Sequence, residues 1–264
     1  VFFLLGGTGR MATVSISIGL AFMVVGFLDD FIKIKLRQNQ GLKAYQKIIF
    51  QLTISILIGL FCFLNGITIF YLPFVNKTVS LGVFTIPIVA LIFIAVTNSV
   101  NLTDGLDGLS SNVSLWYLVS LVALCVVQLT FFGRLYLRQD EYKNVILLCC
   151  ALIGGILGFL VFNTNKAKVF MGDTGSLSLG GFIGALTVFT SNAFYMPILG
   201  ICLVLSSVSV IVQVLYYKRT KKRIFLMAPF HHHLQMKGYT ETQISYFYSL
   251  ITVILGVIAI IFYF

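Results

Sequence analysis

Apolar segments long enough to cross a bilayer recur along the whole of this 264-residue chain. A helix needs about 20 predominantly apolar residues to span the hydrocarbon core. Hydrophobic residues make up 59% of the chain and charged residues 10%, whereas a typical soluble domain has about 25% charged residues. This excludes a soluble globule, a disordered chain and a disulfide scaffold. We predict an all-α, polytopic membrane protein, one domain over residues 1–264, with about eight transmembrane helices near 11–28, 46–64, 83–100, 112–132, 144–162, 177–192, 194–216 and 245–264.

The Lys and Arg residues are unevenly distributed over the loops between these segments. Thirteen of the 18 fall on one side, namely Lys33, Lys35, Arg37, Lys43, Lys47, Lys166, Lys168, Lys218, Arg219, Lys221, Lys222, Arg223 and Lys237. The other side has Arg10, Lys77, Arg134, Arg138 and Lys143. Because the more basic side of a membrane protein faces the cytoplasm, we expect both chain ends to lie outside. The net charge of +10 is then mainly an orientation signal. Its secondary role is to hold anionic headgroups or phosphates. Nucleic acid is not an expected partner.

Small residues at GxxxG spacing predict close helix packing at two places. The pairs are Gly154 with Gly158 and Gly180 with Gly184. Glycine lets two helix backbones approach closely in a membrane, where no hydrophobic effect drives helices together. We interpret both pairs as packing positions.

Five of the eight acidic residues are aspartates at the predicted cytoplasmic edge, which are Asp29, Asp30, Asp104, Asp107 and Asp173. Ionisable groups near a bilayer are costly and are functional candidates. Simpler interpretations exist for each motif. Asp29 and Asp30 also fit a polar stop at the end of a span, and the Asp-Gly pairs fit a turn. The Thr and Ser after Asp173 also fit a helix cap.

Two segments point to phosphate chemistry. In AKVFMGDTGSL, the residues around Asp173 resemble a helix N-terminus, which suits a phosphate, and a hard cation such as Mg²⁺ prefers carboxylate oxygens. The three histidines are consecutive, at His231, His232 and His233. On spacing alone a phosphate-binding role and an interfacial basic loop are equally favoured. A zinc site is the third alternative, but no cysteine lies nearby to complete it.

The motifs VNLTDGLDGL, AKVFMGDTGSL and KRIFLMAPFHHH resemble, in order, those of the polyprenyl-phosphate N-acetylhexosamine-1-phosphate transferases. The similarity runs from about residue 17 to the C-terminus. The His triplet is similar to the branch that acts on phospho-N-acetylmuramoyl-pentapeptide. The resemblance implies a Mg²⁺-dependent membrane transferase in peptidoglycan synthesis, in the bacterial plasma membrane with a cytoplasmic active site. Its substrates would be UDP-MurNAc-pentapeptide and undecaprenyl phosphate, its products lipid I and UMP, and a homodimer would be a further assembly to test.

The resemblance also implies roles for individual residues. The aspartate pair, Asp29 and Asp30, would lie near the lipid phosphate, where one acts as nucleophile or base. Asp104 would be the third active-site aspartate and Asp173 the magnesium ligand. Catalytic contacts are further expected from His231 and His232, and substrate contacts from Lys33, Asn101, Asp107, Asn163, Phe170, Ser176, Gln213 and His233.

This chain departs from the family at its N-terminal end. Family members have ten spans, and the first two, with a Lys-containing loop, have no counterpart here. Val1–Leu5 is too short to span a membrane and resembles the tail of an earlier element, so we expect a chain truncated at its N-terminus. The alternatives are a sibling transferase that uses UDP-N-acetylglucosamine and a transporter without chemistry. Transporter sites lie near the midplane, whereas these aspartates lie at one edge.

Overall fold

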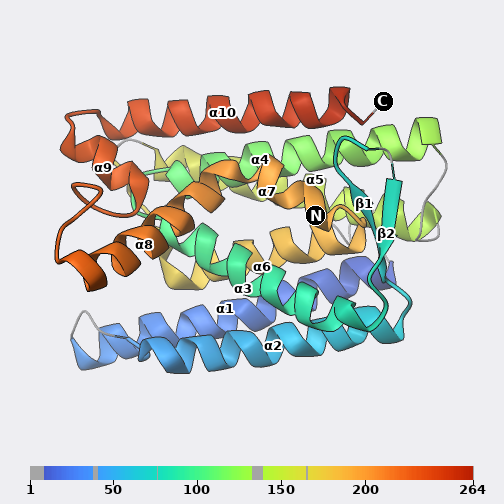
Figure 1. Cartoon of the computed structure of the whole chain (residues 1–264), viewed down its shortest axis with the longest axis horizontal. Coiled ribbons are helices and arrows are strands. Elements are labelled where there is room, and N and C mark those ends of the chain that lie inside the picture. Colours follow the sequence, from blue (N-terminus) through green and yellow to red (C-terminus); the bar gives the residue numbers. More distant parts are fainter. Residues whose placement is uncertain (1–8, 38–40, 76, 133–138, 165, 264) are drawn as a thin grey trace.

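A computed structural model describes residues 9–37, 41–75, 77–132, 139–164 and 166–263, and it shows a bundle of long helices (Figure 1). The only sheet in these residues is a hairpin of β1 (Ile69–Leu72) and β2 (Lys77–Ser80), in which Ile69 pairs with Ser80. The α-helices are α1 (Arg10–Leu36), α2 (Ala44–Leu64), α3 (Thr85–Thr103), α4 (Leu109–Val127), α5 (Gln139–Asn163), α6 (Gly172–Phe189), α7 (Met196–Leu199), α8 (Ile201–Thr220), α9 (Phe230–Met236) and α10 (Glu241–Ile261). The prediction of an all-α polytopic membrane protein is confirmed.

Seven helical segments of the described chain are long and apolar enough to span a membrane, which are Arg10–Leu36, Ala44–Leu64, Gly82–Thr103, Leu109–Phe131, Gln139–Asn163, Ile201–Thr220 and Glu241–Ile261. The predicted segment 177–192 forms the helix α6 but is not among them. Its first turn carries Asp173 and polar neighbours, and most of its remaining residues are buried by other helices. A helix that faces protein rather than lipid does not need the hydropathy of a lipid-facing span, and this explains the difference.

The helix α6 lies at the centre of the bundle and packs chiefly against α1 and α3. A Cβ added at Gly180 would lie 2.6 Å from the Thr97 Cα, and one at Gly184 would lie 2.8 Å from the Phe93 ring. The predicted packing role of this pair is therefore confirmed. The described residues show no such packing at Gly154 and Gly158, because none of their atoms lies within 4 Å of a Cβ built at either position.

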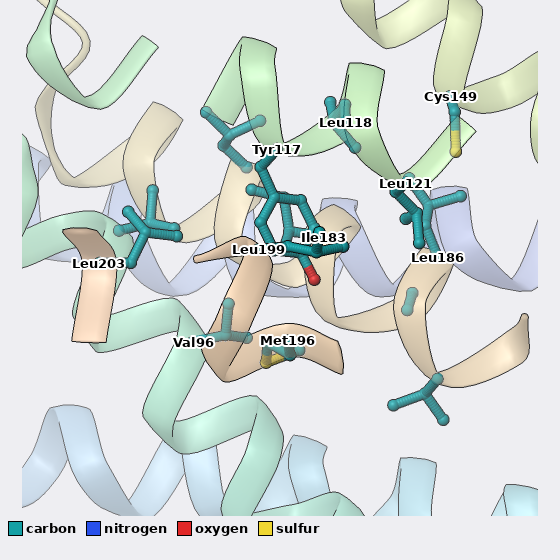
Figure 2. Close-up of a cluster of buried hydrophobic side chains, with 14 of the residues drawn as sticks. Val96, Tyr117, Leu118, Leu121, Cys149, Ile183, Leu186, Met196, Leu199 and Leu203 are labelled. Atoms are coloured by element: carbon teal, nitrogen blue, oxygen red, sulfur yellow. The ribbon is translucent and has the colours of Figure 1, made fainter. Parts of the chain in front are cut away.

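One cluster of the hydrophobic core lies between α3, α4, α5, α6 and the α7–α8 segment (Figure 2). Tyr117 of α4 lies among Ile183, Leu186 and Leu199 and is fully buried. Its hydroxyl forms a 2.8 Å hydrogen bond with the Thr187 hydroxyl. The core therefore satisfies this buried phenol, and it fixes α4 against α6.

The bundle has two distinct ends, one carrying α9 and the other carrying the β1–β2 hairpin (Figure 1). The start of α1 lies at the hairpin end, where the Glu141 carboxylate accepts a hydrogen bond from the Arg10 backbone N–H at 3.0 Å. The end of α10 lies there too (Figure 1). Of the basic residues predicted for the outer side, Lys77 and Lys143 belong to elements that start at this end, whereas Arg134, Arg138 and the opening segment Val1–Leu5 lie outside the described residues.

Candidate functional site

Three of the predicted aspartates meet at the α9 end of the bundle. Asp29 and Asp30 come from the last turns of α1, and Asp173 comes from the first turn of α6. One carboxylate oxygen of each lies within 4.8 Å of the others. This is the only such group of His, Cys, Asp or Glu side chains in the described part of the chain. Three carboxylates at this spacing offer only oxygen ligands, the type that hard cations prefer.

The close approach of α1 to α6 brings these carboxylates together. A Cβ added at Gly26 would lie only 2.2 Å from the Asp173 backbone oxygen, so no other residue fits at this crossing. One turn later, the Asp30 Oδ2 accepts hydrogen bonds from the Thr174 backbone N–H at 2.8 Å and from the Thr174 hydroxyl at 2.7 Å. Asp30 therefore satisfies a free donor at the start of α6, a place where a carboxylate is also favoured by the helix dipole.

Two lysines offset part of the negative charge of the three aspartates. The Lys33 Nζ lies 2.6 Å from Asp29 Oδ2, 2.9 Å from Asp173 Oδ2 and 3.5 Å from Asp30 Oδ1. The Lys47 Nζ, from the first turn of α2, lies 3.1 Å from Asp173 Oδ2. From the sequence we expected Lys47 only to contribute to orientation in the membrane. Its spacing to the aspartates along the chain is long, so only the packing of α2 against α3 and α1 shows that it belongs to the site.

Asn101 completes the surroundings of Asp173. Its Nδ2 donates to Asp173 Oδ1 at 2.6 Å and to the Ser176 hydroxyl at 2.9 Å. Its Oδ1 accepts a hydrogen bond from Lys47 at 3.3 Å. The predicted residues Asn101 and Ser176 are thus brought to the cluster, where they orient Asp173.

A cavity of about 310 Å³ lies directly beside the cluster. Its lining includes predicted site residues from three separate parts of the sequence, which are Asn101, Asp104, Asp107, Asn163, Phe170 and Asp173. Phe170 is 74% exposed, so its ring is free to stack on a planar ligand. Asn163 is held by Val169, whose carbonyl accepts its Nδ2 at 2.8 Å, and Asp107 accepts the Ala167 backbone N–H at 2.9 Å. The loop after α5 is thus fixed against the cavity.

Asp104 is not part of the aspartate cluster, but the charges of the cluster affect its pKa. Burial, and then the negative charges of Asp173 and Asp30, raise the pKa of Asp104 from its ordinary 3.8 to about 7. A carboxyl group that titrates near neutral pH in a cavity can hold or release a proton during a reaction.

Two histidines approach the Asp104 loop from α9. A Cβ added at Gly105 would lie 2.6 Å from the His231 Nε2 and 3.0 Å from the His232 Nε2. His231 is fully buried, and neither ring nitrogen has a hydrogen-bond partner among the described residues. Burial, and then the neighbouring His232, lower the pKa of His231 to about 3. In the absence of substrate the His231 ring is therefore neutral at pH 7.

Gln213 and His233 lie away from the cavity lining and hold the loop between α8 and α9. The Gln213 Oε1 accepts the backbone N–H groups of Ile224 and Phe225 at 3.1 and 3.0 Å. The His233 Nδ1 accepts the Leu226 backbone N–H at 3.1 Å. The structure therefore does not bring these two residues to the aspartate cluster, and their substrate contacts stay predictions.

Glu241 belongs to the cavity but is not among the site residues predicted from the sequence. It lines the cavity beside Asp107, and its Oε2 accepts the Asp107 backbone N–H at 3.2 Å. The sequence feature that could have identified Glu241 is its position at the start of α10, shortly after the three histidines.

The sequence is similar to those of known transferases. Residues 12–191, which include all the site aspartates, match the profile of glycosyl transferase family 4. A phospho-N-acetylmuramoyl-pentapeptide-transferase of Clostridium botulinum is 43% identical over 92% of this chain and 71% of its own length. The corresponding Clostridioides difficile protein is 43% identical over 91% and 72%. That of Listeria monocytogenes is 40% identical over 99% and 79%.

Proposed function

The chain belongs to glycosyl transferase family 4, with the phospho-N-acetylmuramoyl-pentapeptide-transferases, and on that premise we propose that it moves phospho-MurNAc-pentapeptide from UDP-MurNAc-pentapeptide to undecaprenyl phosphate. In this reaction an oxygen of the lipid phosphate bonds to the sugar-bearing phosphorus. The bond from that phosphorus to UMP breaks, so the products are lipid I and UMP. The enzyme is a phospho-sugar transferase of peptidoglycan synthesis.

The observation that carries this proposal is the aspartate cluster beside the 310 Å³ cavity at one end of a membrane bundle. Phosphoryl transfer needs placement of two phosphates and neutralisation of their charge. The cluster, with Lys33 and Lys47, supplies charged groups of both signs at one point. Because the helices around it are apolar, one of the two substrates can be a lipid.

The aspartate cluster also fits a magnesium ion. All its donors are carboxylate oxygens, their spacing is that of ligands around one ion, and a lysine ammonium already lies among them. Asp173 is the proposed ligand, with Asp29 and Asp30 beside it. When bound, Mg²⁺ would neutralise the charge of the phosphates.

Of the two aspartates at the end of α1, Asp30 is better placed than Asp29 to act on the lipid phosphate. Asp29 is 3% exposed, and its Oδ1 accepts the Leu42 backbone N–H at 2.8 Å. The Asp30 side chain is 25% exposed, and among the described residues its Oδ1 has only the 3.5 Å contact with Lys33. We assign Asp30 as the group that accepts a proton from the lipid phosphate, and Asp29 as the group that holds Lys33.

The remaining roles follow from the cavity. Phe170 would stack on the uracil, while Asp107 and Asn163 hold the nucleoside. Lys33 and Lys47 would bind phosphate oxygens. Asp104 lines the cavity, and His231 and His232 lie behind it beside Gly105. These three groups would serve as proton donors or acceptors for the leaving or attacking phosphate.

We further propose that this site faces the cytoplasm of a bacterial cell, in a multi-pass plasma membrane protein. The support is the charge distribution. Lys33, Lys47 and the basic segment that ends α8 lie at the α9 end of the bundle (Figure 1). A cytoplasmic site has direct access to a soluble nucleotide sugar.

A comparison of two donors tests the substrate assignment. Purified protein in detergent, with Mg²⁺ and undecaprenyl phosphate, receives either radiolabelled UDP-MurNAc-pentapeptide or radiolabelled UDP-N-acetylglucosamine. We expect label in the lipid fraction from the first donor alone. Label from the second donor alone would assign the chain to the sibling reaction instead.

A further inference from the structure

A chain of hydrogen bonds connects the Asp107 loop to the histidine segment through the start of α10. The Asp107 backbone N–H donates to Glu241 Oε2 at 3.2 Å. The Gln235 Nε2 donates to Glu241 Oε1 at 3.3 Å. The Gln235 Oε1 in turn lies 3.1 Å from the His232 Nδ1. Two residues with no role in the proposed reaction, Gln235 and Glu241, thus lie between two parts of the site.

The chemistry of these groups fixes the direction of each hydrogen bond. An ionised carboxylate only accepts, so Gln235 must turn its amide NH₂ toward Glu241. The carbonyl oxygen of Gln235 then faces His232, and a carbonyl oxygen only accepts. The proton of this hydrogen bond must therefore come from His232 Nδ1. In the neutral ring, the other nitrogen, Nε2, carries a lone pair and no proton.

The Nε2 of His232 lies beside Gly105, a residue of the cavity lining. A Cβ added at Gly105 would lie 3.0 Å from it, next to Asp104 in the cavity wall. We infer that Glu241, acting through Gln235, is a positioning residue that holds His232 in the Nδ1–H tautomer and presents Nε2 to the substrate as a proton acceptor. This inference rests on the proposed function for the identity of the substrate, but the tautomer follows from the hydrogen bonds alone. It differs from a permanent donor role for His232, which would need a proton on Nε2.

His233 provides an internal reference, because its hydrogen bond requires the opposite tautomer. Its Nδ1 accepts the Leu226 backbone N–H at 3.1 Å and so carries no proton. The neutral His233 ring must then be the Nε2–H tautomer. Two adjacent histidines of one short helix are therefore expected in opposite tautomers, which a single spectrum can distinguish.

The test is a nitrogen–proton correlation spectrum of the protein in detergent, with only its three histidines labelled with ¹⁵N. It is recorded at about pH 8.5, well above the ordinary imidazole pKa of about 6.5. His232→Gln and His233→Gln variants assign the two signals. We expect the Nδ1–H pattern for His232 and the Nε2–H pattern for His233. An Nε2–H pattern for His232 would overturn the inference. No turnover is needed, so an error in the substrate assignment leaves this result unaffected.

Two substitutions then test whether the relay sets the tautomer. In Glu241→Gln, the new amide can still accept from Asp107 but offers an NH₂ group to Gln235. Gln235 should then rotate, present its own NH₂ to His232, and change His232 to the Nε2–H form. Gln235→Leu removes the acceptor and should leave a mixture of both tautomers. An unchanged, pure Nδ1–H signal in both variants would overturn the positioning role.

Kinetics provide the functional measurement. Outer-shell partners that orient metal-bound histidines typically contribute about 10-fold or more to activity. By analogy, we expect kcat of Glu241→Gln to fall by about that factor. KM for the nucleotide sugar should stay nearly unchanged, because Asp107 keeps its hydrogen-bond acceptor. The matched control is Gln243→Leu, which removes a nearby glutamine side chain whose Oε1 accepts the Thr240 backbone N–H at 3.0 Å. An equal loss of kcat in the control would contradict a specific effect on His232.

Discussion

The substitution Asp104→Asn should stabilise the protein at neutral and alkaline pH while reducing its activity. Burial and the charges of Asp173 and Asp30 raise the Asp104 pKa from 3.8 to about 7. The folded protein therefore holds the Asp104 proton more tightly than the unfolded chain does. For a group with a raised pKa, the stabilisation is present at low pH and is lost as pH rises through the folded-state pKa.

The magnitude follows from the size of the shift. The difference between 3.8 and about 7 is roughly three pKa units, and each unit corresponds to about 1.4 kcal/mol. The ionised Asp104 thus lowers the free energy of unfolding by about 4 kcal/mol at pH 8. At pH 4, where the folded-state carboxyl is protonated, the effect falls below about 1 kcal/mol. Asparagine has a similar shape and no charge, so it removes this penalty at all pH values.

The assay is thermal unfolding of wild type and variant in detergent at pH 8 and pH 4. A stabilisation of about 4 kcal/mol corresponds to a rise in Tm of roughly 10 °C for a chain of this size. The control is Asp140→Asn, which removes the same charge from an exposed position at the start of α5. If Asp104→Asn and the control have the same Tm shift at both pH values, burial does not destabilise the Asp104 carboxylate and the reasoning is refuted.

Three further predictions concern packing, metal binding and orientation. Gly26→Ala, whose Cβ would meet the Asp173 backbone at 2.2 Å, should destabilise the protein by about 1–3 kcal/mol and abolish transfer. In contrast, Gly158→Ala, with no atom of the described residues within 4 Å, should be neutral or stabilise by up to about 1 kcal/mol. Equal melting curves of the two variants would argue against a forced α1–α6 contact. Asp173→Asn should raise the Mg²⁺ concentration needed for half-maximal transfer, and an unchanged Mg²⁺ curve would remove Asp173 from the metal site. A membrane-impermeant thiol reagent applied to intact cells should label Lys77→Cys and spare Lys237→Cys, whereas the reverse pattern would invert the proposed orientation.

Hydropathy predicted most of the fold because every helix that faces lipid must have an apolar surface. Each of the seven candidate spans overlaps a predicted segment. The exception, α6, is covered by other helices, and a helix protected from lipid tolerates glycine, serine and a charged first turn. For the same reason the sequence did not distinguish Gly180 from Gly158, since both lie at GxxxG spacing and only the neighbours of each helix differ.

The site was predictable where its residues form a local motif. Asp29, Asp30 and Asp173 belong to short polar runs in apolar sequence, and the structure brings them together. Lys47 was missed because it lies among other lysines of one loop, and its contact with Asp173 depends on tertiary packing. Gln213 was predicted to contact substrate, but the structure shows it bonded to the backbone of a nearby loop. A polar residue near the end of a span can hold a loop rather than a ligand.

Transfer activity of the Asp30→Asn variant tests the central claim most directly. The measurement is the initial rate at which purified protein releases UMP from UDP-MurNAc-pentapeptide in the presence of undecaprenyl phosphate and Mg²⁺, with lipid-linked product counted in parallel. Wild type should form UMP and lipid product in equal amounts. Asp30→Asn should form both at a rate lower by a factor of about 100 or more, as expected when a proton acceptor is removed, while its thermal unfolding still shows a folded protein. A folded Asp30→Asn variant that forms lipid product at the wild-type rate would contradict the account.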